Sequence, residues 1–201
     1  MKIPSKPIAC LLAALSSAAI QAKATLIYDN GPINGTWGAY IVQPPYSVSD
    51  SFTVTGSFNL GSVQAGLWVL SGDAPSTIGW SIGTAPFLSD ISSGISSLTN
   101  TFYTNLFGQF DIYQSVFNIT GAVGPGTYYL TLGNGTTSNN NVMGWDINFG
   151  PSSAYHNTIG QIDSESFQIF GTSGVPDAGS SVMLLGIGLA GVGWMRRKLP
   201  C

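Results

Sequence analysis

Basic residues are missing from the whole central part of this chain. Between Thr25 and Gly174 there is no Lys or Arg, whereas acidic residues are spread through the same interval. Such a purely acidic domain would repel phosphate backbones and anionic lipid surfaces. We therefore expect no nucleic-acid partner. The basic residues all lie in the two terminal segments: Lys2, Lys6, Lys23, Arg196, Arg197 and Lys198.

Cysteine and histidine are equally scarce. The two cysteines, Cys10 and Cys201, lie in the terminal segments, and His156 is the only histidine. The domain therefore folds without disulfides, and zinc sites built from His and Cys are excluded. No nucleophile-elbow motif surrounds His156, so a Ser-His-Asp site is not expected either. We predict no catalytic residues and a domain that is not an enzyme.

Carboxylates are the remaining source of site chemistry. Asp163 and Glu165 would share one face of an extended segment, but same-strand neighbours lie side by side and do not flank a substrate as a glycosidase pair does. Asp29, Asp50 and Asp163 are candidate ligands for a structural calcium ion, with turn capping as the alternative. No loop of the DxDxDG type occurs. Beyond this candidate calcium we predict no cofactor.

The overall composition favours an all-β extracellular domain. Charged residues make up 7% of the chain, against about 25% in an average soluble protein. Short runs with alternating apolar residues, such as Phe52 and Val54, are separated by Gly, Pro and Asn. We predict one antiparallel, jelly-roll-like β-sandwich over residues 25–171, with an immunoglobulin-like sandwich as the alternative. The predicted strands are Thr25–Tyr28, Ser47–Thr55, Val63–Leu70, Ile78–Ile82, Asn100–Tyr103, Phe110–Ile119, Thr127–Leu132, Val142–Phe149 and Ser166–Phe170.

The first 24 residues have the three parts of a secretory signal peptide. Lys2 and Lys6 form a positive start, Ile8–Ile20 is an apolar stretch, and Ala22-Lys23-Ala24 is a small-x-small cleavage site. We predict export, with cleavage after Ala24.

The C-terminal segment 172–201 has the pattern of a short membrane anchor. Val182–Met195 carries no charge and is followed at once by Arg196, Arg197 and Lys198, which would stay on the cytoplasmic side. A spanning helix needs about 20 residues. The run 182–195 is shorter than that, so we predict a transmembrane helix that anchors the chain only transiently.

The residues before this helix carry a family resemblance. The order Val175, Pro176, Asp177, Gly179 and Ser180, then an apolar helix and a basic end, resembles the VPDSG-type variant of the PEP-CTERM sorting signals. Ala178 stands where that variant often has Ser or Thr. The resemblance implies recognition by an exosortase-like membrane enzyme that cuts near motif 175–181. It also implies transfer to a surface acceptor, with exopolysaccharide as a candidate partner. Gly171 to Gly174 is expected to act as a flexible spacer.

The tryptophans suggest a second function for the domain. Trp68 and Trp80 lie within apolar strands and are expected in the core, which leaves Trp37 and Trp145 as candidate glycan-stacking residues. Our main expectation is a non-catalytic protein of the cell surface or extracellular matrix. The alternative is a carbohydrate-binding module that acts on exopolysaccharide.

Overall fold

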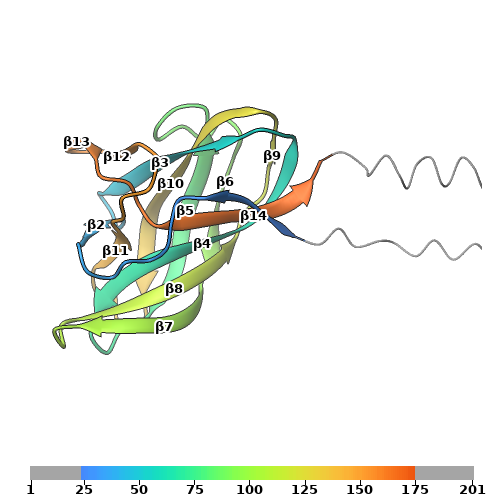
Figure 1. Ribbon diagram of the computed structural model, residues 1–201. Coiled ribbons are helices and arrows are strands. Elements are labelled where there is room, and N and C mark those ends of the chain that lie inside the picture. The colour runs from blue at the N-terminus through green and yellow to red at the C-terminus, as the bar shows by residue number, and fades with distance from the viewer. Residues whose placement is uncertain (1–23, 175–201) are drawn as a thin grey trace, which may run out of the picture.

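The computed structural model describes residues 24–174, and every regular element in that range is a β-strand (Figure 1). All strand pairs are antiparallel, which confirms the predicted all-β class. The eight-stranded sheet contains β1 (Thr25–Asp29), β2 (Ala39–Ile41), β4 (Phe58–Leu70), β7 (Thr99–Leu106), β8 (Phe110–Asn118), β9 (Ala122–Val123), β11 (Met143–Asp146) and β14 (Phe167–Ser173). The six-stranded sheet contains β3 (Ser47–Val54), β5 (Pro75–Gly83), β6 (Ser92–Ser97), β10 (Gly126–Thr137), β12 (Ala154–His156) and β13 (Gly160–Ile162).

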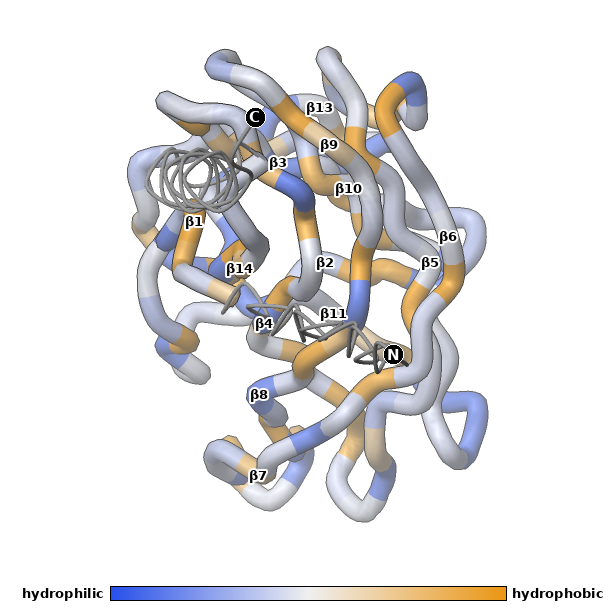
Figure 2. Tube along the Cα trace, turned by 90° about the vertical axis from the view of Figure 1, so that its right-hand side faces the viewer, coloured by the Kyte–Doolittle hydropathy of each residue, from blue (hydrophilic) through white to orange (hydrophobic). Residues whose placement is uncertain are grey.

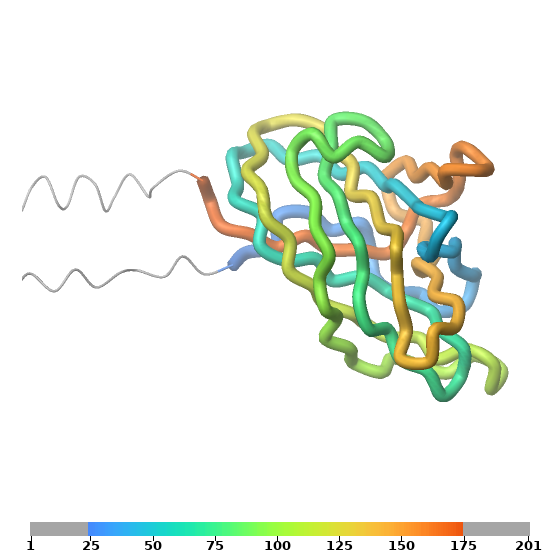
Figure 3. Tube along the Cα trace, turned by 180° about the vertical axis from the view of Figure 1, so that it is seen from behind, coloured from blue at the N-terminus to red at the C-terminus, as the bar shows by residue number. Residues whose placement is uncertain are grey.

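Two long strands organise the sheets. In the first sheet, β4 pairs with β14, β8, β9 and β11, and in the second, β10 lies between β3 and β5. Figure 3 views the molecule from behind, where β5 and β10 run side by side. Each predicted run overlaps one of the strands, whereas β2, β6, β9, β12 and β13 were not predicted. These five strands are short or rich in Ser and Gly, so their apolar pattern is weak.

Alternating apolar residues from both sheets share one core. Val63 and Leu67 of β4 are fully buried, as are Leu130 and Leu132 of β10. Residues two apart on a strand point to the same face, so the period of two seen in the sequence becomes the inward face of each strand. Figure 2 shows the apolar segments on strands of both sheets.

The register of β14 places the ends of the described range side by side. Thr25 lies opposite Gly171, and Ser173 lies opposite Phe58, the first residue of β4 (Figure 1). Leu70, at the other end of β4, therefore lies at the opposite end of the domain, which we call the distal end. β2 and β11 pair next to that last part of β4 and lie on the distal side.

The prediction that Gly171 to Gly174 form a flexible spacer is wrong, because Gly171 to Ser173 belong to β14. Gly174 continues this contact by donating its backbone N–H to the Ser57 carbonyl at 2.9 Å. A Cβ at Gly171 would lie 2.3 Å from the Asn59 carbonyl oxygen, so this glycine permits close strand contact rather than flexibility. The folded domain thus extends two residues past its expected end at position 171.

The predicted sorting segments lie largely outside the described residues. Ala22, the signal helix, the motif residues Val175 to Ser180, the C-terminal helix and the basic end all fall there. Within residues 24–174, no helix is long and apolar enough to cross a membrane.

Candidate functional site

A groove of about 510 Å³ lies between the loop that follows β1 and the loop that follows β11. Residues 29–32 with Asn34 and Trp37 form one wall, and residues 148–151 form the other. Asp29 lies opposite Gln168, which lies opposite Gln64 in the middle of β4, and β11 runs from the level of Val69 back toward that of Leu67. The groove therefore lies beside the middle of the domain, on the side of β2 and β11 (Figure 1).

Two exposed aromatic rings meet at this groove. Trp37 is 67% exposed and Phe149 is 69% exposed, and their ring centroids lie 5.1 Å apart in an edge-to-face arrangement. Large aromatic side chains are usually buried, and an exposed pair beside a hollow is typical of ligand-binding surfaces. The groove is therefore the strongest candidate binding site in residues 24–174.

A buried polar network fixes the groove from beneath, and Asn30 is its centre. The side-chain amide of this fully buried residue lies 2.7 Å from the hydroxyls of both Ser152 and Ser164, and 2.6 Å from the carbonyl of Glu165. It also lies 3.3 Å from Asp50 Oδ2. An amide has two hydrogens, so these four acceptors compete for them. The network joins the first wall to β3 and to the segment before β14.

The second wall of the groove, residues 148–151, is hydrogen-bonded to Asn30 as well. Asn148 donates its side-chain amide to the Asn30 carbonyl at 2.8 Å and accepts a hydrogen bond from Gly150 N at 2.9 Å. A Cβ at Gly150 would lie 2.2 Å from the Asn30 carbonyl oxygen, so only glycine fits this approach. The two walls are held in a fixed relation before any ligand binds.

Three buried carboxylates belong to this network or lie close to it, and they differ in their hydrogen-bond partners. Asp146 accepts hydrogen bonds from Trp68 Nε1 at 2.6 Å and Asn34 N at 2.9 Å, and Asp50 accepts from Glu165 N at 2.8 Å. Burial raises the pKa of Asp50 to about 6 and also raises the pKa of Asp146, and the hydrogen bonds to each carboxylate partly offset this rise.

Glu165 is the exception among these acids. It is fully buried, and neither of its carboxylate oxygens has a hydrogen-bond partner. Burial raises its pKa well above the usual value, and the negative charges of Asp50, Asp146 and Asp163 raise it further. A carboxylate without donors in such a site favours its neutral, protonated form.

The structure separates the two candidate glycan residues. Trp37 lies in the groove, but Trp145 is fully buried and donates its Nε1 to the Ser166 carbonyl at 2.9 Å. The assignment of Trp145 to a stacking surface is therefore wrong, since its side chain fills the core beside Phe167. Trp68 and Trp80 are each only 7% exposed, which confirms their predicted burial.

The acidic residues are also separated. Asp163 is exposed and Glu165 is buried, so the two do not share a face as expected. This segment connects β13 to β14 and belongs to neither strand, and Glu165 forms only an isolated bridge with Ile147, so strand alternation does not apply to it. Among residues 24–174, no group of three or more His, Cys, Asp or Glu side chains is placed to hold a metal ion. Asp29, Asp50 and Asp163 form no such group, and calcium binding stays a prediction.

His156 has the surroundings of a structural residue. Its ring lies 5.8 Å from that of Tyr40 and 5.5 Å from that of Tyr46, and its Nδ1 accepts a hydrogen bond from Thr158 N at 3.2 Å. Burial lowers its pKa, which favours the neutral ring.

Phe149 and Asn30 were missed by the sequence reasoning. Phe149 stands at the end of a run that was predicted as one strand over Val142–Phe149, whereas β11 ends at Asp146. The Gly150-Pro151 pair directly after it was the available signal for an exposed loop. Asn30 has no such signal, because an Asn-Gly pair reads as a turn wherever it lies.

Comparison with known families identifies the C-terminal segment of the chain. The family model described as the VPDSG-CTERM motif matches residues 174–199. The chain carries a VPDSG-CTERM motif. The match starts at the last described residue, so it identifies the C-terminal signal and not the β-domain. A comparison with curated proteins finds no match.

The VPDSG-CTERM motif indicates how the chain is exported and processed. It indicates an exported protein that bears a sorting signal and is processed by a membrane sorting enzyme. It is also consistent with export and transient anchoring in the membrane.

Proposed function

We propose that this chain is a protein of the bacterial cell surface or extracellular matrix and the substrate of an exosortase-like enzyme. The observation that carries the proposal is the VPDSG-CTERM motif at residues 174–199. After export and removal of the signal peptide, the enzyme cuts near Val175-Pro176-Asp177 and discards the apolar helix. The domain is then displayed as a non-catalytic, jelly-roll-like β-sandwich.

The position of the motif supports this proposal. β14 runs to Ser173, so the motif begins directly where the folded domain ends. Pro176 disfavours a helical conformation at Val175 and so promotes an extended peptide, which suits an enzyme active site at the membrane face. A sorting enzyme could reach this peptide without unfolding the domain.

The buried setting of His156 supports a non-catalytic domain. The ring packs against the rings of Tyr40 and Tyr46, and its Nδ1 is hydrogen-bonded to Thr158, so no serine or cysteine nucleophile is paired with it in residues 24–174.

Processing is expected to change both the N-terminus and the C-terminus of the mature protein. In its own cells, the chain is expected to begin after Ala24 and to lack every residue beyond the motif. Intact mass spectrometry of the surface fraction measures both ends in one experiment. Recovery of a chain that still ends at Cys201 as the main surface form would contradict the proposal.

A matched pair of motif variants sharpens this test. Pro176→Ala removes the fixed φ angle and is expected to leave most of the chain unprocessed in the membrane fraction. Ala178→Ser restores a residue common in the VPDSG-type variant and should be processed like the wild type. Equal processing of both variants would show that the proline is not recognised.

A carbohydrate-binding role is the second candidate function for the displayed domain. The observation that favours it is the groove between Trp37 and Phe149, where two exposed aromatic rings meet.

A further inference from the structure

Most of the hydrogen-bond donors of the Trp37–Phe149 groove are used within the protein. Pro32 and Pro151 have no backbone N–H, and the amide side chains of Asn34 and Asn148 donate to the carbonyls of Ile147 and Asn30. The following backbone N–H groups of the lining also have partners inside the protein: Asn30, Gly31, Asn34, Trp37, Asn148 and Gly150. A ligand that needs donors from the protein, such as an anion or an added peptide strand, therefore finds few of them.

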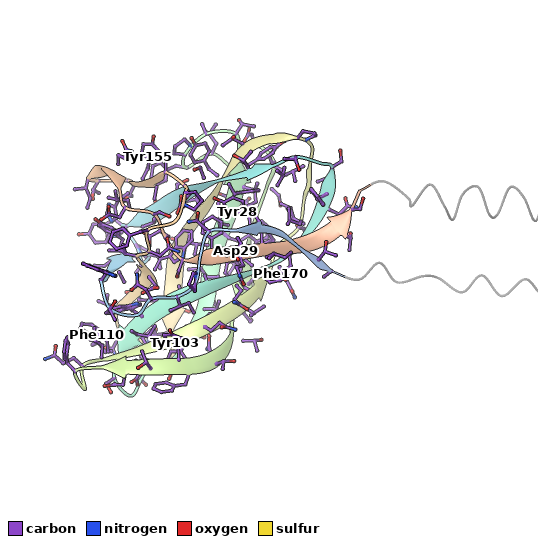
Figure 4. All side chains as sticks on the ribbon, viewed as in Figure 1. Tyr28, Asp29, Tyr103, Phe110, Tyr155 and Phe170 are labelled. Atoms are coloured by element: carbon purple, nitrogen blue, oxygen red, sulfur yellow. The ribbon has the colours of Figure 1, made fainter. Side chains whose placement is uncertain are left out.

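Acceptors and apolar surface remain available in the groove. Asp29 closes β1 at the edge of the groove and is labelled in Figure 4. It is exposed, and its Oδ1 accepts a hydrogen bond from Gly31 N at 2.9 Å, whereas its Oδ2 has no hydrogen-bond partner in residues 24–174. The exposed rings of Trp37 and Phe149 add an apolar face beside this acceptor. This set suits a ligand that donates hydrogen bonds from one side and presents C–H groups on another.

The absence of positive charge in the domain further restricts the class of ligand that the groove can bind. Residues 25–174 contain no Lys or Arg, and Asp29 lies in the groove itself. An anionic polymer would bring like charges together without a compensating cation. An uncharged polymer meets no such penalty.

From these observations we infer that the Trp37–Phe149 groove binds a neutral polysaccharide. A pyranose ring stacks its C–H face on Trp37, and its hydroxyl groups donate to the Asp29 carboxylate. This inference rests on the carbohydrate-binding candidate above and adds the class of glycan and the contact residues. It is independent of processing by the sorting enzyme.

Affinity electrophoresis of the full chain in a zwitterionic, sugar-free detergent tests this inference. Native gels contain either neutral polysaccharides, such as dextran, galactomannan and β-glucan, or the anionic polymers alginate and polygalacturonate. We expect retardation by at least one neutral polymer and none by the anionic ones. Trp37→Ala should weaken binding by roughly tenfold or more. Phe107→Ala is the matched control, because Phe107 is an 87% exposed aromatic residue in the β7–β8 turn.

Three results would overturn the inference. They are no retardation by any neutral polymer, retardation by the anionic polymers alone, and equal binding by Trp37→Ala and the wild type. Retardation by anionic polymers alone would support a carbohydrate-binding role but would show that the ligand is not a neutral polysaccharide. The absence of all glycan binding would remove that role. Neither result bears on the processing measured by mass spectrometry.

Discussion

Replacing Glu165 by Gln is expected to raise the free energy of unfolding at pH 8, by on the order of 1 kcal/mol or more. Glu165 is fully buried, its carboxylate oxygens have no hydrogen-bond partner, and Asp50, Asp146 and Asp163 place negative charge around it. An ionised carboxylate in this site is strongly unfavourable. Gln keeps the shape of the side chain and cannot ionise.

The pH dependence follows from the direction of the pKa shifts. Because the pKa of Glu165 is raised in the folded state, its stabilising contribution is complete below the unfolded pKa, near 4.5, and is lost as pH rises through the folded value. Asp50, with its pKa raised to about 6, and Asp146 act in the same direction. The melting temperature of the full chain should therefore fall between pH 5 and pH 8. The fall should be smaller in Glu165→Gln, and the two proteins should agree most closely near pH 5.

Two further variants isolate the effect. Glu165→Met, an apolar side chain of similar length, should show the same gain at pH 8 if charge is the cause. Asp90→Asn is the acid-to-amide control, because Asp90 is exposed and its pKa is lowered by hydrogen bonds from Thr84. It should not stabilise the domain at pH 8.

Two outcomes would contradict this account of Glu165. One is a wild-type melting temperature that does not fall above pH 5, with no gain from Glu165→Gln. The other is stabilisation of the wild type by Ca²⁺ at pH 8 that Glu165→Gln abolishes, since a cation rather than a proton would then neutralise the site.

Replacing Gly150 by Ala is expected to destabilise the domain by about 1–3 kcal/mol, as overpacking of a fixed contact does. The added Cβ would lie 2.2 Å from the Asn30 carbonyl oxygen and 2.8 Å from Asn30 Cγ. The same carbonyl accepts the side-chain amide of Asn148, so relief of the clash also strains the bond that joins the groove walls. Thermal unfolding measures the loss, and polysaccharide binding should weaken with it.

Gly124→Ala is the matched control for this substitution. Nothing lies within 4 Å of a Cβ at Gly124, so the same chemical change meets open space. It should leave the melting temperature unchanged or slightly higher, because Ala restricts the unfolded chain. Equal stability of Gly150→Ala and the wild type would show that the two walls are not locked together.

The strands were predictable where burial alternates along a run. Phe52 and Val54 in β3, and Leu130 and Leu132 in β10, show the period of two in the sequence and are buried in the structure. β6 was not predictable in this way, because its residues are mostly Ser and Gly and Ile95 points outward with 74% exposure. Its place at the edge of the sheet comes from pairing with β5, a contact that no local pattern encodes.

The candidate site was predictable in part. An exposed Trp37 was one of two expected glycan residues, but Trp145 is in the core because it lies directly opposite the buried Leu67 of β4, on the inward face of the sheet. The partner ring, Phe149, reaches Trp37 only through the fold, across a separation in sequence that no short motif spans.

The sequence by itself determined the sorting tail, the all-β class and the acidic character of the domain. Each of these depends on the order or count of residues within one segment, and the tail motif is read by an enzyme as a linear peptide. Only the tertiary structure decided which tryptophan is exposed, that Gly171 belongs to a strand, and that Glu165 is buried without a donor. These depend on contacts between segments distant in the chain, where burial and hydrogen-bond partners are set by the packing of the whole domain.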